Sequence, residues 1–187
     1  QEPDVDVRVA ATHEQTSATA KVQLASDPKT TPVTVDAHKL FPANVDEPVH
    51  DNVLLFHFSE AALLDNTLAR YRNDQPYTFT SNILTSVNPC RPVPNMYSAA
   101  KMAAYVGGIL GSLSEPHLYA IAEESYRLLL RSREHQSLVV SGVSGAGKTE
   151  ANKHVLRYLC WRASHCPGTF KRGTKVEISA DAITSTK

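Results

Sequence analysis

Residues 138–149 read Leu138-Val139-Val140-Ser141-Gly142-Val143-Ser144-Gly145-Ala146-Gly147-Lys148-Thr149. The first three are apolar without alternation, which is typical of a short strand buried on both faces of a parallel sheet. Residues 142–149 fit the pattern G-x-x-x-x-G-K-[ST], and a helical pattern follows directly. A phosphate-binding loop between a strand and a helix predicts an α/β fold with a P-loop NTPase core, in which a partial mixed sheet is flanked by helices.

The residue types of this loop suit a nucleoside triphosphate. Its glycines open backbone conformations that are closed to residues with a Cβ, so successive N–H groups can point at phosphate oxygens. A helix beginning at Thr149 presents its positive dipole end to the same anion. Lys148 is the catalytic candidate, because its ammonium can reach the β and γ phosphates, and the Thr149 hydroxyl is the candidate Mg²⁺ ligand. The expected ligands are ATP and Mg²⁺, and the cofactor-binding candidates in the loop are Gly142, Val143, Ser144, Gly145, Ala146, Gly147, Lys148 and Thr149.

Two elements are predicted well before the loop. Ser59 can cap a helix that runs through Arg72. The spacing i, i+4, i+7 predicts one apolar face on this helix, made of Leu64, Leu68 and Tyr71. Residues 77–80 and 83–87 are rich in aromatic and β-branched side chains and are separated by Ser81-Asn82, which predicts paired strands.

Two further helices are predicted on either side of the loop. Ser114-Glu115-Pro116 is a helix opening, and the apolar spacing after it predicts a helix that ends near Arg133. The helix after the loop should end at Pro167-Gly168. Its packing stripe is expected to be Ala151, Val155, Leu159 and Arg162. The cysteines and histidines match no zinc-ligand spacing, so they are interpreted, like Trp161, as packing or exposed residues.

Residues 1–50 differ from the rest in composition. Every aromatic residue lies at or after Phe41, so this segment has little material for a core. Short alternations at 21–24 and 33–35 favour small edge strands. We therefore predict two parts: a poorly defined segment at 1–50, either a tail or a small strand-rich appendage, and the P-loop-containing part at 51–187.

Composition excludes several classes of protein. Nineteen Lys and Arg balance nineteen Asp and Glu, so the positive field that drives non-specific nucleic-acid binding is missing. No apolar stretch approaches a membrane span, and the first residues have no secretory leader pattern. Three cysteines are too few for a disulfide framework and favour a reducing, intracellular compartment.

The position of the loop bears on the class of NTPase. Small kinases and GTPases usually open with the P-loop, whereas 141 residues precede Gly142 here. The acidic residue expected at the end of a second buried strand is not evident after Thr149, since residues 176–181 are a poor candidate. The residues alone leave three alternatives open: a motor, a P-loop kinase or other NTPase, and a nucleotide-binding module that no longer hydrolyses.

The sequence around the loop resembles the myosin motor P-loop. Residues 136–153, QSLVVSGVSGAGKTEANK, are similar to the family pattern Q-S-x-x-x-[ST]-G-E-S-G-A-G-K-T-E-x-x-K. Three upstream blocks agree in order and rough spacing, and the resemblance covers about Asn52 to Leu159. These blocks are Leu64-Asp65-Asn66 through Arg70-Tyr71, Tyr77-Thr78-Phe79-Thr80 through Val87-Asn88-Pro89, and Pro116-His117-Leu118-Tyr119-Ala120-Ile121-Ala122 through Ser125-Tyr126.

The resemblance implies the amino-terminal part of a myosin heavy-chain motor domain, truncated before its switch loops. It implies a Mg-dependent, actin-activated ATPase of the cytoplasm and cytoskeleton, with light chains as further partners. In that family, residues matching Asn88 and Tyr97 flank the adenine. This sequence departs in having Val143 for the usual Glu and one extra residue between Asn88-Pro89 and Tyr97. It contains neither NxNSSR nor DxxGFE, so we expect that hydrolysis and actin binding require regions outside these 187 residues.

Overall fold

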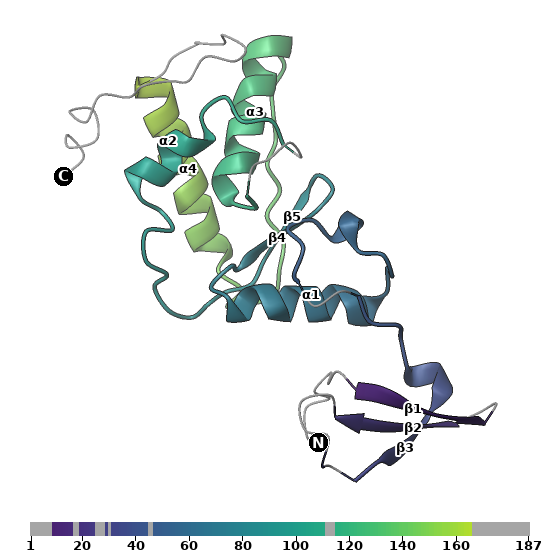
Figure 1. The fold of residues 1–187 in the computed structure, drawn as a ribbon. Helices are drawn as coiled ribbons and strands as arrows, with labels where there is room; N and C mark the ends of the chain where they lie inside the picture. The colour runs from purple at the N-terminus through teal and green to yellow at the C-terminus, as the bar shows by residue number, and fades with distance from the viewer. Residues whose placement is uncertain are drawn as a thin grey trace. The chain divides into compact units, whose positions relative to one another are not determined.

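A computed structural model describes residues 9–16, 19–24, 29, 31–44, 47–110 and 115–165. The chain divides into two compact units, Gln1–Ala69 and Arg70–Lys187. Figure 1 shows the elements of both units in chain order. The predicted phosphate loop lies in the second unit.

The first unit contains a three-stranded antiparallel sheet in the order β1-β2-β3. Its strands are β1 (Val9–Thr16), β2 (Thr19–Leu24) and β3 (Val33–Asp36), and the 3₁₀ helix η1 (Ala37–Lys39) follows. The alternations expected at 21–24 and 33–35 lie in β2 and β3, which pair with Ala20 opposite Val35. Ala20 and Val22 are buried, as the two-residue period of a strand predicts for one covered face.

A helix spans the boundary between the two units. It is α1 (Glu60–Arg72), which follows the 3₁₀ helix η2 (Asn52–Leu54). The predicted cap is confirmed, because the Ser59 hydroxyl accepts a hydrogen bond from the Ala62 N–H at 3.2 Å.

The predicted apolar face of α1 is wrong at Leu64, which is 50% exposed. The buried positions are instead Ala62, Asn66 and Arg70, one turn apart. Asn66 is buried because its amide is satisfied: its oxygen accepts from the Val49 N–H at 2.9 Å and its nitrogen donates to Asn52 Oδ1 at 2.7 Å. The buried side of α1 is therefore determined by the hydrogen bonds of its polar residues rather than by a row of apolar side chains.

The paired strands predicted after α1 are confirmed. β4 (Tyr77–Thr80) and β5 (Ile83–Ser86) form an antiparallel hairpin with Phe79 opposite Leu84. Ser81 turns the chain with a φ of 59°, a conformation typical of tight turns.

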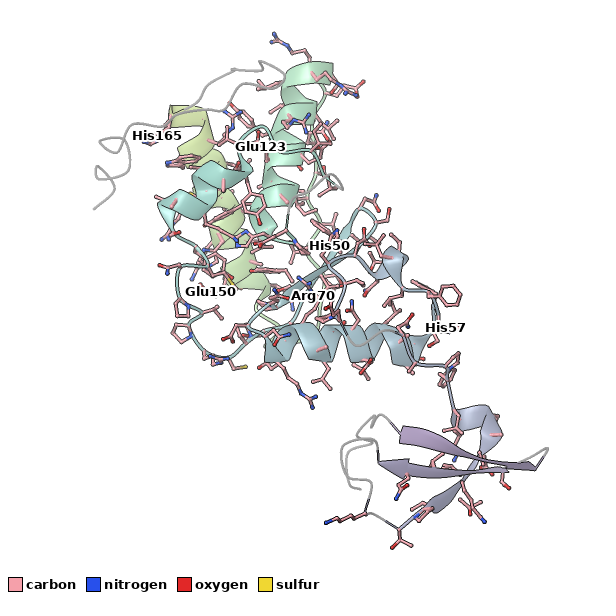
Figure 2. All side chains as sticks on the ribbon, viewed as in Figure 1. His50, His57, Arg70, Glu123, Glu150 and His165 are labelled. Atoms are coloured by element: carbon pink, nitrogen blue, oxygen red, sulfur yellow. The ribbon has the colours of Figure 1, made fainter. Side chains whose placement is uncertain are left out.

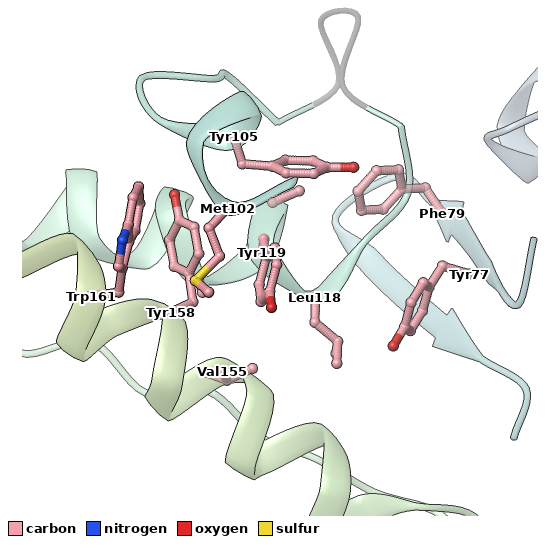
Figure 3. Packing of buried hydrophobic residues seen from close by; sticks show 11 residues of the cluster. Tyr77, Phe79, Met102, Tyr105, Leu118, Tyr119, Val155, Tyr158 and Trp161 are labelled. Carbon is pink, nitrogen blue, oxygen red and sulfur yellow. The ribbon is translucent and has the colours of Figure 1, made fainter. Parts of the chain in front are cut away.

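The core of the second unit joins this hairpin to three helices. These are α2 (Ala99–Tyr105), α3 (Leu118–Ser132) and α4 (Lys148–His165). Figure 3 shows the buried cluster, which is unusually aromatic. Its labelled members are Tyr77, Phe79, Met102, Tyr105, Leu118, Tyr119, Val155, Tyr158 and Trp161. Trp161 is therefore a packing residue, as predicted.

The ends of α3 and α4 refine the predicted boundaries. His117, not the predicted opening residue, caps α3 by accepting from the Tyr119 N–H at 3.0 Å. Ser114 and the predicted helix end at Pro167-Gly168 lie outside the described residues. Arg133 ends α3 in a left-handed conformation with φ 58°, close to the predicted stop.

The buried strand predicted at residues 138–140 is not formed. Val139 is 90% exposed, and β4 and β5 pair only with each other. A parallel strand requires neighbours with which to share its N–H and C=O groups, and the described residues contain none for 138–140. Both described sheets are antiparallel, so the predicted mixed sheet is not seen in the described part of the chain.

A buried ion pair joins α3 to α4. Arg162 Nε donates to Glu123 Oε2 at 2.9 Å, and the Tyr158 hydroxyl donates to the same oxygen at 2.8 Å. The Gly107 N–H donates to Glu123 Oε1 at 2.9 Å. The Arg162 guanidinium also lies over the Tyr126 ring, 4.8 Å from its centroid. This network fixes the orientation of α4, whose first residues belong to the phosphate loop.

Candidate nucleotide site

The glycines of residues 142–149 adopt the conformations for which glycine is needed. Gly142, Gly145 and Gly147 have φ of 153°, 81° and 94°. At Gly142 an added Cβ would approach the Ala146 Cβ to 3.2 Å, which is tighter than ordinary contact. The predicted use of glycine to shape the loop is thus present in the backbone.

Lys148 folds back over the loop that precedes it. Its ammonium donates to the carbonyl oxygens of Gly142 and Val143, both at 2.8 Å. An ammonium has three N–H donors, so this arrangement leaves one for a further acceptor. The positive charge is therefore held at the loop by its own backbone, beside the glycine-rich turn.

The first turn of α4 supplies backbone donors at the same place. The Ala151 N–H bonds back to the Gly147 carbonyl at 2.9 Å, whereas the N–H groups before it in the helix have no partner one turn earlier. Unpaired N–H groups and the helix dipole both favour an anion there. Thr149 is exposed in this turn, so its hydroxyl is accessible.

Asn88 connects the turn after the β4–β5 hairpin to the phosphate loop, 57 residues later. Its amide nitrogen donates to the Gly145 carbonyl at 3.0 Å. Its amide oxygen accepts from the Cys90 N–H at 2.9 Å, which holds the turn in shape. The structure therefore brings together two groups of residues that the sequence singled out separately.

A cavity lies between this turn and the start of α4. Its walls come from the hairpin and its following turn, from Tyr97 and from the loop and first turn of α4. The lining residues are Pro76, Tyr77, Ser86, Val87, Asn88, Pro89, Tyr97, Ala146, Gly147, Glu150 and Ala151. The sequence-predicted residues Asn88, Tyr97, Ala146 and Gly147 are thus wall residues of one cavity.

Tyr97 is fixed in this wall from several sides. Its hydroxyl is 2.5 Å from the Tyr77 hydroxyl, and its backbone carbonyl accepts from the Tyr119 hydroxyl at 3.4 Å. Its ring stacks on His154, with centroids 3.5 Å apart and planes 9° from parallel. Burial, followed by the hydrogen bond with Tyr97, raises the pKa of Tyr77, so the Tyr77 phenol is neutral at pH 7.

Charged groups flank the cavity and its supporting core. Glu150, in the first turn of α4 (Figure 2), accepts from the Lys153 ammonium at 2.6 Å, which lowers the pKa of its carboxyl. Behind the cavity, burial lowers the pKa of His117 to about 4. Its neutral ring then has Nε2 as donor to the Met96 carbonyl and Nδ1 as the cap acceptor of α3.

Sequence reasoning missed several wall residues. Tyr77 could have been predicted to be buried beside Phe79, because residues two apart in a strand lie on the same face. Glu150 and Ala151 follow the loop directly and could have been included by proximity alone. His154, which stacks on the wall residue Tyr97 without lining the cavity, had no signal beyond its helical spacing of four and three from Glu150 and Ala151.

The described residues contain no group of three or more His, Cys, Asp or Glu side chains placed to hold a metal ion. Thr149 is instead a single hard oxygen donor at the loop. Mg²⁺ usually takes only one or two protein ligands together with phosphates and waters, so this donor fits that ion. No helix among the described residues has both the length and the apolar character to cross a membrane.

Comparison with known proteins agrees with the pattern of the loop. The family model described as myosin head (motor domain) matches residues 49–180. Unconventional myosin-VI of Mus musculus is 44% identical over 124 residues, which are 65% of this chain and 10% of that protein. Myosin-9 of Arabidopsis thaliana is 40% identical over 132 residues, 69% of this chain and 8% of that protein. The chain therefore spans about a tenth of the length of these relatives, and it belongs to the myosin head (motor domain) family.

Proposed function

We propose that the chain is the nucleotide-binding part of an ATP-driven motor that moves on actin. The observation that carries the proposal is the hydrogen bond from Asn88 to the Gly145 carbonyl. This hydrogen bond connects the cavity, whose walls include Tyr97 and Pro89, to the loop that carries the Lys148 ammonium. The first turn of α4 adds backbone N–H groups that have no partner one turn earlier. Such a pair of subsites suits the base and the triphosphate of one nucleotide.

In this proposal the phosphate chain lies along residues 142–149. Lys148 moves its ammonium from the carbonyls of Gly142 and Val143 toward the β and γ phosphates, and N–H groups of the loop and first helical turn hold phosphate oxygens. The Thr149 hydroxyl would hold Mg²⁺ as one of its few protein ligands. When bound, Mg²⁺ neutralises charge on the β and γ phosphates.

The base lies in the cavity beside Asn88 and Tyr97. Pro89 and Tyr97 offer flat apolar surfaces, and the hydroxyl groups of Tyr77 and Tyr97 offer polar edges. A base packed in this way excludes water from the cavity. Because the local dielectric constant is then lower, each polar contact to the base is stronger.

Hydrolysis and force production belong to the whole motor in this proposal. Phosphoryl transfer needs a positioned water and further charge stabilisation, neither of which residues 142–149 can supply alone. Actin filaments are the proposed track and the cytoplasmic cytoskeleton the proposed location, with light chains as further partners. The membership of the motor family supports this choice over a P-loop kinase.

The test is the variant Lys148→Ala in the full-length motor. Loss of the ammonium should weaken MgATP binding or slow turnover at least about tenfold, because charge-assisted contacts to phosphate are among the strongest in a site. Lys153→Ala is the matched control, since Lys153 is an exposed lysine of the same helix that pairs with Glu150. Normal ATP binding and turnover by Lys148→Ala would contradict the proposal. Binding without turnover in the unmodified motor would favour a non-hydrolysing module.

A further inference from the structure

His154 is the face-to-face neighbour of a cavity wall residue. It lies in α4, one turn after Glu150 and Ala151, both of which line the cavity. Its ring stacks on Tyr97 with centroids 3.5 Å apart and planes 9° from parallel. His154 itself is not among the lining residues, so it contacts Tyr97 from outside the cavity.

Among the described ring contacts of Tyr97, His154 supplies the one ring that lies parallel to its own. The Tyr77 hydroxyl holds the far end of the side chain, and the Tyr119 hydroxyl holds the backbone carbonyl. The rings of His117 and Tyr119 meet Tyr97 at interplanar angles of 56° and 71°. A side chain held at its two ends can still rotate about its long axis, and a parallel ring against its face opposes that rotation.

The His154 ring is present for its flat surface more than for its hydrogen bonds. Its Nδ1 is buried and has no hydrogen-bond partner among the described residues. Burial, and after it the nearby Arg157 charge, lowers the pKa of His154, so the ring is neutral at pH 7. A neutral imidazole with an unpaired nitrogen contributes mainly stacking.

We propose that His154 is a positioning residue for the base of the bound nucleoside triphosphate, acting by holding the plane of Tyr97. The inference rests on the proposed function, because it assigns the cavity to the base. It predicts that His154 affects ligands that carry a base and leaves the binding of the bare phosphate chain unchanged. In the described structure the His154 ring stacks on Tyr97, whereas the Lys148 ammonium bonds to carbonyl oxygens of the loop itself, so the two effects are separable.

The experiment compares two probes in the full-length motor: MgATP and magnesium tripolyphosphate, each competing with a fluorescent ATP analogue. His154→Ala should weaken MgATP binding by about three- to tenfold, the range expected for one aromatic stacking contact, with tripolyphosphate binding unchanged. His154→Phe keeps a flat ring and should restore MgATP binding. Cys160→Ala, at an exposed position of the same helix, is the control.

The outcomes separate this inference from the proposed function. The inference is overturned if the ratio of the MgATP and tripolyphosphate affinities is unchanged in His154→Ala. If both affinities fall by the same factor, His154 only stabilises α4. Failure of His154→Phe to restore MgATP binding would exclude stacking as the cause. If the unmodified motor bound neither probe, the proposed function would fail, and the inference with it.

Discussion

Val143 is the residue at which the phosphate loop departs from the family pattern, and its side chain is 79% exposed. The loop uses this residue through its backbone, because its carbonyl accepts from the Lys148 ammonium. We therefore expect Val143→Glu in the full-length motor to change the free energy of nucleotide binding by less than about 1 kcal/mol. Titration with a fluorescent ATP analogue measures this. A large loss or gain would reveal a side-chain role that the backbone contacts do not explain.

His117 makes stability depend on pH. Burial lowers its pKa to about 4, while an unfolded histidine titrates near pH 6.5. Between these values the unfolded state binds the extra proton, so stability is complete above about pH 6.5 and is lost as the pH falls toward 4. The loss from this one group should be about 3 kcal/mol.

Urea unfolding at pH 7 and pH 4.5, followed by the fluorescence of Trp161, tests this effect. His117→Asn should lose less stability over that interval, because Asn can accept the same cap hydrogen bond without titrating. Other groups also titrate, including Glu115, whose pKa is lowered by Lys101. The decisive quantity is therefore the difference between the two proteins. Equal losses would exclude His117 as the cause.

Between elements, the ion pair of Glu123 and Arg162 determines how α4 packs on α3. Both side chains are buried, so removing Glu123 leaves the buried Arg162 guanidinium without the carboxylate that balances its charge. Glu123→Ala should lower the free energy of unfolding by about 3 to 5 kcal/mol. Lys153→Ala breaks the exposed pair with Glu150 and should cost less than about 1 kcal/mol. Urea unfolding of the two variants compares them, and similar small losses would show that the buried pair contributes little.

The elements themselves could be predicted where the signal was local. Ser59 caps α1 as expected, and the aromatic and β-branched residues of 77–80 and 83–87, separated by Ser81-Asn82, predicted the hairpin that β4 and β5 form. The burial of Asn66 and Arg70 could not be predicted, because it depends on hydrogen-bond partners such as the Tyr77 carbonyl, which Arg70 Nε reaches at 3.1 Å. The periodicity of apolar residues predicts the apolar face of a helix. It does not predict which polar side chains are buried because they form hydrogen bonds in the folded protein.

At the scale of the whole molecule, one part of the candidate site could be predicted from the residues alone and another part only from the resemblance to a family. The glycine pattern predicted the shape of residues 142–149 from the residues alone. The resemblance implied that Asn88 flanks the adenine, but its hydrogen bond to Gly145 was not predicted, since nothing local connects residues 57 positions apart. The strand at 138–140 could not form among the described residues, because strand formation requires a partner that a local apolar run does not specify.

That exposed run leads to a prediction for the 187-residue chain by itself. Val139 just before the predicted phosphate loop and Val143 within it are exposed, and residues 138–140 have no neighbouring strand in the described structure. Unpaired apolar backbone favours association between copies, so the purified chain should be poorly soluble. It should also show no useful ATP turnover, because the phosphate contacts proposed for Lys148 and Thr149 would not by themselves position the attacking water. Phosphate release with and without actin filaments measures this, with the full-length motor as the positive control. Actin-stimulated turnover by the 187-residue chain would mean that these residues contain a complete catalytic site.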